Sequence, residues 1–143
     1  MIDTTTNRHL LQIRVYYEDT DAGGIVYYAN YLRYAERART ELMRGLGLES
    51  SQLMRREGVL LAVRRCYVDY FCAAVLDDDL VVETVLHRVG GASLDAIQIV
   101  RRGDDVLVSI NLKLGCISLE GRATRLPESI RETLVNYLNS NKS

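Results

Sequence analysis

The second half of the chain is an almost continuous series of segments with strand character. Four segments rich in β-branched residues occupy residues 59–71, 80–89, 93–102 and 106–119. Turn-forming residues separate them: the acidic run at 77–79, the glycine pair at 90–91 and residues 103–105. Because short connections favour antiparallel neighbours, this pattern predicts a single antiparallel sheet.

One long amphipathic helix is predicted ahead of these strands, over residues 28–46. Its apolar residues recur three or four positions apart and form one stripe, made of Leu32, Ala35, Ala38, Leu42 and Leu46. The two alanines leave little side-chain bulk on this stripe, so a sheet can approach closely. The helix is therefore expected to pack against the sheet.

Weaker signals complete the order of elements. Alternating residues predict a half-buried strand over 9–17, with one face formed by Leu11, Ile13, Val15 and Tyr17. A short helix is indicated at 50–57 and a last one at 127–138, where proline suits the first helical position. The order predicts an α+β fold in which a five-stranded sheet packs on one long helix. Long strands with open edges invite pairing with a second chain, so a dimer is expected.

Size and composition narrow the classes of protein that fit. A length of 143 residues suits one domain, so residues 1–143 are expected to form a single unit. The longest apolar run, residues 70–76, has seven residues, whereas a membrane-spanning helix needs about 20. The net charge of −1 argues against a protein built mainly to hold nucleic acid. An early acid and no apolar leader at the N-terminus predict a cytoplasmic protein.

The cysteines and histidines show no metal-ligand pattern. Cys66, Cys72 and Cys116 contain no CxxC pair, which fits reduced thiols in a cytosolic protein. All three lie in apolar or alternating stretches, so they are predicted to be buried. His9 and His87 are far apart and lack metal-ligand spacing, so no metal site is predicted.

The densest group of reactive side chains lies between the first strand and the long helix. Three carboxylates occur within residues 18–21, followed by a Gly-Gly pair and the start of the helix. A carboxylate held near the apolar residues 25–27 would be desolvated and more basic. Free N–H groups at the helix start point toward an anion or a developing oxyanion. Together these groups could catalyse acyl transfer, although acids before a helix are also common as caps.

The sequence YYEDTDAGGIVYYANY at residues 16–31, continued by ERARTE at 36–41, closely resembles that of hot-dog-fold acyl-CoA thioesterases. Within them it is most similar to the Tol–Pal-associated group of the 4-hydroxybenzoyl-CoA thioesterase family. The likeness extends more loosely through residues 76–78 and 92–94, and so covers most of the chain. It implies the hot-dog fold, in which an antiparallel five-stranded sheet wraps around a long central helix.

The resemblance also implies roles for particular residues. The second Asp of the family's D-T-D element falls on Asp21, which would act as general base or nucleophile toward the thioester. The backbone N–H at the helix start falls on Tyr28 and would polarise the thioester carbonyl. The acyl end of the pocket would be lined by Gly24, Ile25 and Val26. Tyr27 could line the same pocket or pack in the core.

Two departures from the family pattern affect these assignments. Tol–Pal-associated members usually carry His where this chain has Tyr28, whereas the 4-hydroxybenzoyl-CoA enzymes tolerate Tyr there; a backbone amide would serve with either side chain. Ser93 matches the family's serine in a CoA-facing turn, but Gly90 stands where many relatives have a basic residue. Arg88, two residues earlier, could contact a CoA phosphate or be a solvated arginine at a strand end.

These observations predict an enzyme that hydrolyses acyl-CoA thioesters to free acid and CoA. Small Ala and aromatic Tyr residues around the motif favour short-chain or aromatic acyl groups. CoA is part of the substrate, so no cofactor is expected. The resemblance implies a homodimer, often paired into a homotetramer, with each active site between two subunits, and Tol–Pal or lipid-synthesis proteins as partners.

Two other functions compete with this prediction. A non-catalytic acyl-CoA sensor or scaffold of the Tol–Pal cell-envelope system could reuse the same pocket. A hot-dog dehydratase fits poorly, because such enzymes usually depend on a catalytic His and neither His9 nor His87 lies in the motif.

Overall fold

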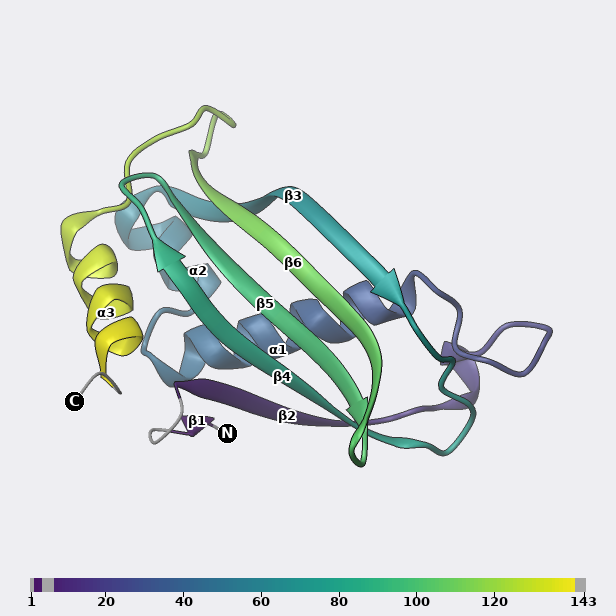
Figure 1. The fold of residues 1–143 in the computed structure, drawn as a ribbon. Helices are drawn as coiled ribbons and strands as arrows, with labels where there is room; N and C mark the ends of the chain where they lie inside the picture. The colour runs from purple at the N-terminus through teal and green to yellow at the C-terminus, as the bar shows by residue number, and fades with distance from the viewer. Residues whose placement is uncertain (1, 4–6, 141–143) are drawn as a thin grey trace.

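In the computed structural model, which describes residues 2–3 and 7–140, a curved antiparallel sheet packs along one long helix (Figure 1). The strands are β1 (Ile2–Asp3), β2 (Arg8–Arg14), β3 (Val59–Tyr70), β4 (Asp79–Val89), β5 (Ser93–Arg102) and β6 (Asp105–Ser118). The helices are α1 (Asn30–Gly45), α2 (Ser50–Gln52) and α3 (Glu128–Asn139), with helical turns η1 (Tyr17–Asp19) and η2 (Leu53–Glu57). The α+β prediction is confirmed, and the two-residue β1 adds a sixth strand to the five expected.

The sheet has the strand order β1-β2-β4-β5-β6-β3, and all neighbours are antiparallel. Alternate residues of β4, β5 and β6 are buried on the face that covers α1. β3 differs, because most of its residues from Val63 onward are exposed and β6 is its only partner among the described strands. A long edge strand of this kind is a template for pairing with another chain.

The buried stripe of α1 is displaced from the predicted one. Ala35 and Ala38 are fully buried, as predicted, and let the sheet lie close to the helix. The first turns, however, are anchored by Tyr31 and Tyr34, whereas Leu32 remains 39% exposed. The tyrosine rings supply the larger apolar area, so they occupy the core side of the helix.

The prediction of buried thiols is correct only for Cys116. Cys66 and Cys72 are exposed, the first on β3 and the second in the loop that follows it. Their apolar neighbours suggested a core environment. That environment is missing because the edge of β3 has no further strand beside it.

His9 places a titratable ring in the hydrophobic interior. The side chain is 2% exposed, and its burial lowers the pKa to about 4 from an ordinary value of 6.5. Because the unfolded chain then takes up a proton first, stability is expected to fall as the pH drops below 6.5. Between pH 7.5 and pH 5 the free energy of unfolding should decrease by about 2 kcal/mol.

Urea unfolding at these two pH values measures the effect of His9. His9→Leu should largely remove the difference, because no ring remains to titrate. His87→Leu is the matched control, since His87 is exposed, and it should keep the wild-type difference. An identical pH response in wild type and His9→Leu would show that other groups cause it.

Membrane insertion through a helix is not supported by the described part of the chain. None of its helices is long and apolar enough to cross a bilayer.

Candidate active site

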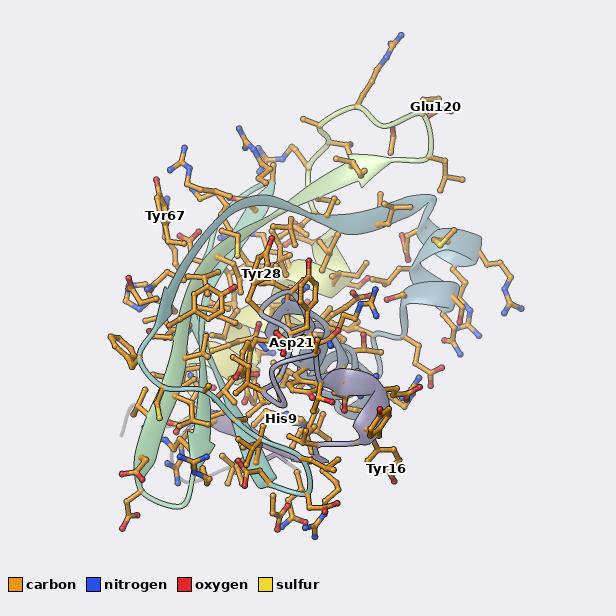
Figure 2. All side chains as sticks on the ribbon, turned by 90° about the vertical axis from the view of Figure 1, so that its right-hand side faces the viewer. His9, Tyr16, Asp21, Tyr28, Tyr67 and Glu120 are labelled. Carbon is orange, nitrogen blue, oxygen red and sulfur yellow. The ribbon has the colours of Figure 1, made fainter. Side chains whose placement is uncertain are left out.

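A tight turn at one end of the molecule holds Asp21 (Figure 2). The Asp21 N–H donates to the Ile25 carbonyl at 2.8 Å, and the Gly24 N–H donates to the Asp21 carbonyl at 3.0 Å. Gly24 has a φ of +82°, a conformation that glycine adopts without strain. The Gly-Gly pair therefore serves a sharp reversal of the backbone that fixes the position of Asp21.

A backbone hydrogen bond orients the Asp21 carboxylate but occupies only one of its two oxygens. Its Oδ1 accepts a hydrogen bond from the Gly23 N–H at 2.8 Å. Its Oδ2 accepts none from residues 7–140 or 2–3, and the side chain is exposed. One oxygen is therefore left to take a proton or attack a ligand. The predicted apolar enclosure is not supplied by one chain, because Ile25 and Tyr27 are exposed and Val26 points into the core.

The start of α1 supplies donors at the same end of the molecule. The helix begins at Asn30, so Tyr28 lies just before it. The sequence had instead indicated a helix that begins at residue 28, with Tyr28 in its first turn. The Asn30 N–H donates to the Tyr27 carbonyl, whereas the Tyr28 N–H has no acceptor within the described residues. Figure 2 shows Asp21 and Tyr28 together at this end. A free N–H beside a helix start can hold a carbonyl oxygen or an oxyanion.

Tyr70 connects this turn to the end of β3. Its hydroxyl donates to the Tyr28 carbonyl at 3.2 Å, and the two rings meet edge to face with centroids 6.2 Å apart. Tyr31 packs against Tyr70 in the same way at 5.8 Å. Burial raises the pKa of both Tyr31 and Tyr70, so their hydroxyls stay neutral donors at physiological pH. Sequence reasoning missed Tyr70, because it lies 42 residues beyond Tyr28 and outside the motif.

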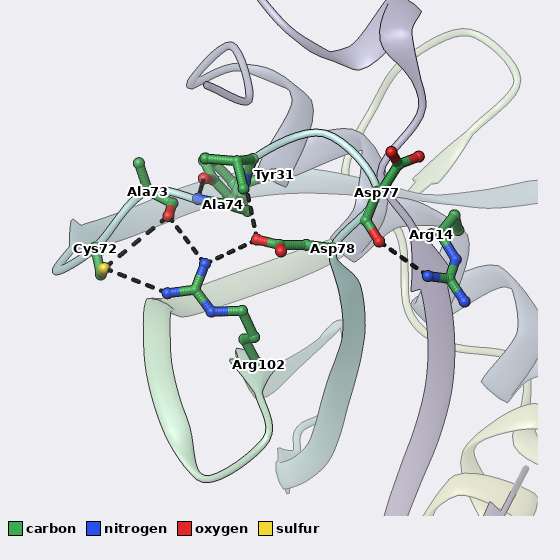
Figure 3. A network of polar contacts seen from close by, with 9 residues as sticks. Arg14, Tyr31, Cys72, Ala73, Ala74, Asp77, Asp78 and Arg102 are labelled. Carbon is green, nitrogen blue, oxygen red and sulfur yellow. Dashed lines mark hydrogen bonds and ion pairs between the residues drawn. The ribbon is translucent and has the colours of Figure 1, made fainter. Parts of the chain in front are cut away.

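The loop between β3 and β4 forms a network of polar contacts (Figure 3) and also bonds to the segment that follows the Asp21 turn. The Val26 N–H donates to the Ala74 carbonyl, and the Ala74 N–H donates to the Tyr31 hydroxyl, both at 2.9 Å. Arg102 closes this loop through a 2.7 Å contact from Nη1 to Asp78 Oδ2. The turn is thus held by bonds to a loop that is distant in sequence.

The predicted CoA-facing residues lie at the opposite end of the same chain, in the β4–β5 turn (Figure 1). Arg88 is exposed there and Ser93 is half-buried. Two arginines that sequence reasoning missed reach this turn. Arg131 Nε donates to the Gly90 carbonyl at 3.1 Å, and the Arg125 guanidinium lies against Gly91. One chain alone does not bring this turn near Asp21.

Two cavities flank α1. The larger, about 770 Å³, lies between β2 and α1 and is walled mainly by charged side chains: Arg14, Arg33, Arg37, Arg44, Glu18, Asp19, Glu36 and Glu41. The other, about 350 Å³, lies between α1 and β3 and is mostly apolar; we call it the α1–β3 pocket. Its lining residues are Glu36, Arg39, Thr40, Met43, Ser50, Leu53, Met54, Leu60, Leu61, Val63 and Leu114. Asp21 and Tyr28 of the same chain do not line it.

The described residues form no set of metal ligands. No group of three or more His, Cys, Asp or Glu side chains there is arranged to hold a metal ion.

Comparisons with known proteins identify the family of this chain. Residues 15–134 match the thioesterase-like superfamily. An acyl-CoA thioesterase YbgC from Haemophilus influenzae is 43% identical over 107 residues, which cover 75% of this chain and 79% of the relative. An acyl-CoA thioester hydrolase YbgC from Escherichia coli is 41% identical over 120 residues, which cover 82% and 89%.

The fold of this chain also matches that of a solved structure. The crystal structure titled "Probable Thioesterase from Bartonella henselae" has a TM-score of 0.81 and 34% identity to this chain. The superposition covers 84% of this chain and 99% of the other. The chain therefore belongs to the thioesterase-like superfamily, as a thioesterase of the hot-dog fold.

Proposed function

We propose that this thioesterase hydrolyses acyl-CoA thioesters to free acid and CoA, with Asp21 as the catalytic residue. The proposal is supported by two groups at one end of the molecule: an oriented carboxylate, and a backbone N–H that has no acceptor among the described residues. Asp21 Oδ2 and the Tyr28 N–H lie at the same end of the molecule, and both lack a partner within the described residues. The curated relatives named as acyl-CoA thioesterases support the substrate class.

The proposed reaction uses these two groups on one carbonyl. The Tyr28 N–H donates to the thioester oxygen and stabilises the negative charge that develops there. Asp21 either takes the proton of an attacking water or attacks the carbonyl carbon itself. The C–S bond then breaks, and the CoA thiolate leaves and is protonated. In the second route, water afterwards cleaves the mixed anhydride on Asp21.

These two routes differ in where the oxygen of water goes. In a single turnover in oxygen-18 water, label in the Asp21 carboxylate requires direct attack, because it enters only when water cleaves the anhydride at the Asp21 carbonyl. With Asp21 as general base, the label appears only in the free acid. The Tyr28 side chain does not enter either route, so the replacement of the family's usual His leaves the polarising amide in place.

The proposal includes a homodimer formed through β3. This strand is open along its outer edge, and Val63, Tyr67 and Tyr70 on it are between 45% and 64% exposed. Antiparallel pairing of β3 with a second copy over its full length sets Tyr70 opposite Val59 of that copy. The Asp21 end of one chain then lies at the β4–β5 end of the other, where Arg88 and Arg125 can approach the phosphates of CoA.

The proposal also places the enzyme in a reducing compartment. Cys66 and Cys72 are exposed free thiols, which are typical of cytoplasmic proteins. The acyl-CoA substrate is consistent with that location.

A thiol-release assay over short, long and aromatic acyl-CoAs tests the function. Turnover of at least one class by the wild-type protein is expected, with short-chain or aromatic groups favoured. Binding that raises the unfolding temperature without any cleavage would instead support a sensor or scaffold of the Tol–Pal system. Asp21 argues against the sensor, because a carboxylate beside an anionic ligand adds no affinity.

A further inference from the structure

Arg39 brings a positive charge into the mostly apolar α1–β3 pocket. Its Nη1 donates to the Gln98 Oε1 at 3.0 Å, and no carboxylate of the described residues forms an ion pair with it. Burial lowers the pKa of the Arg39 guanidinium, and the nearby Glu36 offsets this only in part. Arg39 is thus a half-buried cation whose one hydrogen-bond partner among the described residues is neutral.

Gln98 holds Arg39 in this position. Its side chain is fully buried on β5, and its Nε2 donates to the Ala35 carbonyl at 2.8 Å and to Thr84 Oγ1 at 2.9 Å. These two bonds direct Oε1 toward Arg39. The guanidinium is therefore fixed at the pocket wall and does not extend freely into water, as arginines on exposed helix faces do.

The pocket has the composition of a small-molecule site. Met43, Leu53, Met54, Leu61 and Leu114 supply apolar walls around about 350 Å³. Such sites combine mainly apolar lining with a few fixed polar groups that determine which ligand binds. A desolvated guanidinium without a counter-ion is costly by itself and becomes favourable when an oxygen ligand faces it.

The dimer puts this pocket beside the catalytic turn of the other chain. In the full-length β3 pairing, Tyr70 lies opposite the first residues of β3 in the second copy, and Leu60, Leu61 and Val63 there line the α1–β3 pocket. Tyr70 in turn contacts Tyr28 beside Asp21. The pocket of one chain is therefore open toward Asp21 of its neighbour. This step rests on the proposed function and its dimer.

We infer that the α1–β3 pocket receives the acyl group and that Arg39 binds an oxygen at its far end. The preferred substrates are then acyl-CoA thioesters whose acyl group ends in a carboxylate or a hydroxyl. Arg39 can donate two parallel hydrogen bonds to a carboxylate. A hydroxyl would accept from Arg39 and donate to Glu36, which lines the same pocket.

Matched substrates with acyl chains of two lengths test the inference. Succinyl-CoA is compared with butyryl-CoA, and adipoyl-CoA and 6-hydroxyhexanoyl-CoA with hexanoyl-CoA. At one length or both, wild type should show a kcat/KM about 10-fold or more higher for an oxygenated member. The carboxylate and hydroxyl arms identify which oxygen is preferred. Equal values, or a preference for the plain chains at both lengths, would overturn the inference.

Variants at Arg39 separate its role from a structural one. Arg39→Met should remove the preference by lowering kcat/KM for the oxygenated member, and Arg39→Lys should keep part of it. Arg37→Met is the control, because Arg37 stands on the other side of α1 in the charged cavity. Thermal unfolding verifies that each variant is folded.

A binding measurement keeps the test independent of catalysis. Thioether analogues of adipoyl-CoA and hexanoyl-CoA cannot be hydrolysed, and calorimetry gives their affinity ratio for wild type and Arg39→Met. If no thioester is cleaved, the proposed function fails, while this ratio still decides the role of Arg39. The competing explanation is that Arg39 pairs with Glu36 of the second copy. Sedimentation would then show monomers for Arg39→Met and Glu36→Gln with an unchanged affinity ratio, which would contradict the inference.

Discussion

Asp21→Asn should lower kcat/KM for acyl-CoA hydrolysis by about 10³-fold or more, because an amide can neither accept the proton of water nor attack the thioester. The substitution keeps the shape of the side chain and an oxygen that can accept the Gly23 N–H bond. The turn should therefore persist, and the loss should appear mainly in kcat. Thiol release with the best substrate of the panel measures the effect.

The matched control for Asp21→Asn is Glu18→Gln. Glu18 is an exposed carboxylate three positions earlier in the same cluster, so its loss removes the same charge without touching the turn. Its kcat/KM should stay within about twofold of wild type, since surface charges act weakly at a distance. Asp21→Asn retaining a tenth or more of wild-type activity would remove Asp21 from the catalytic role.

The geometry of the turn at Asp21 was predictable because its parts are neighbours in sequence. Asp21, the glycine pair and the start of α1 fall within ten residues, and each has a local physical reason for its place. Tyr70 and Arg125 have no such signal. They reach the turns only through the pairing of β3 with β6 and through the segment after β6, and these contacts depend on the whole fold.

Local hydrogen bonding explains why the first strand is shorter than the sequence predicted. β2 ends at Arg14, and Tyr17 is 82% exposed, although alternation placed it on the buried face. Asp19 Oδ2 accepts a bond from the Tyr16 N–H at 2.8 Å and favours the helical turn η1. Short side chains that bond their own backbone compete with strand pairing in this way.

Arg39 shows how a charge pattern can mislead. In the sequence it belongs to a run of alternating acids and bases that resembles a solvated helix face. Only the structure shows that Arg39 turns toward Gln98 and the α1–β3 pocket, while Arg37 faces the charged cavity. Arg37 and Arg39 are two positions apart, which is about 200° of rotation around the helix, and this rotation separates the arginine of the charged cavity from the arginine of the pocket.

The second large effect is expected from charging the open edge of β3. Cys66 and Tyr67 are exposed on this strand, and neither lines the α1–β3 pocket. Cys66→Lys combined with Tyr67→Lys should therefore be tolerated by one chain but oppose pairing with a second. We expect monomers in sedimentation and a fall in kcat/KM of about 100-fold or more, because Asp21 loses the neighbour's pocket.

Leu76→Lys is the control for this edge variant. Leu76 is 42% exposed and lies in the β3–β4 loop, six residues beyond the end of β3, where the next two residues bond to Val15. It should remain dimeric and active. A double-lysine variant that is monomeric but fully active would show that one chain holds a complete site.

Subunit mixing decides whether the site is shared. Met43→Trp fills the α1–β3 pocket and should inactivate its own homodimer, as Asp21→Asn does. If Asp21 of one chain acts on a thioester held by the other, a mixed dimer contains one site with both an intact Asp21 and an open pocket. Random exchange of equal amounts should then restore about a quarter of wild-type activity, because half of the dimers are mixed and each has one working site of two. If each chain worked alone, no combination would be intact and mixing would restore nothing.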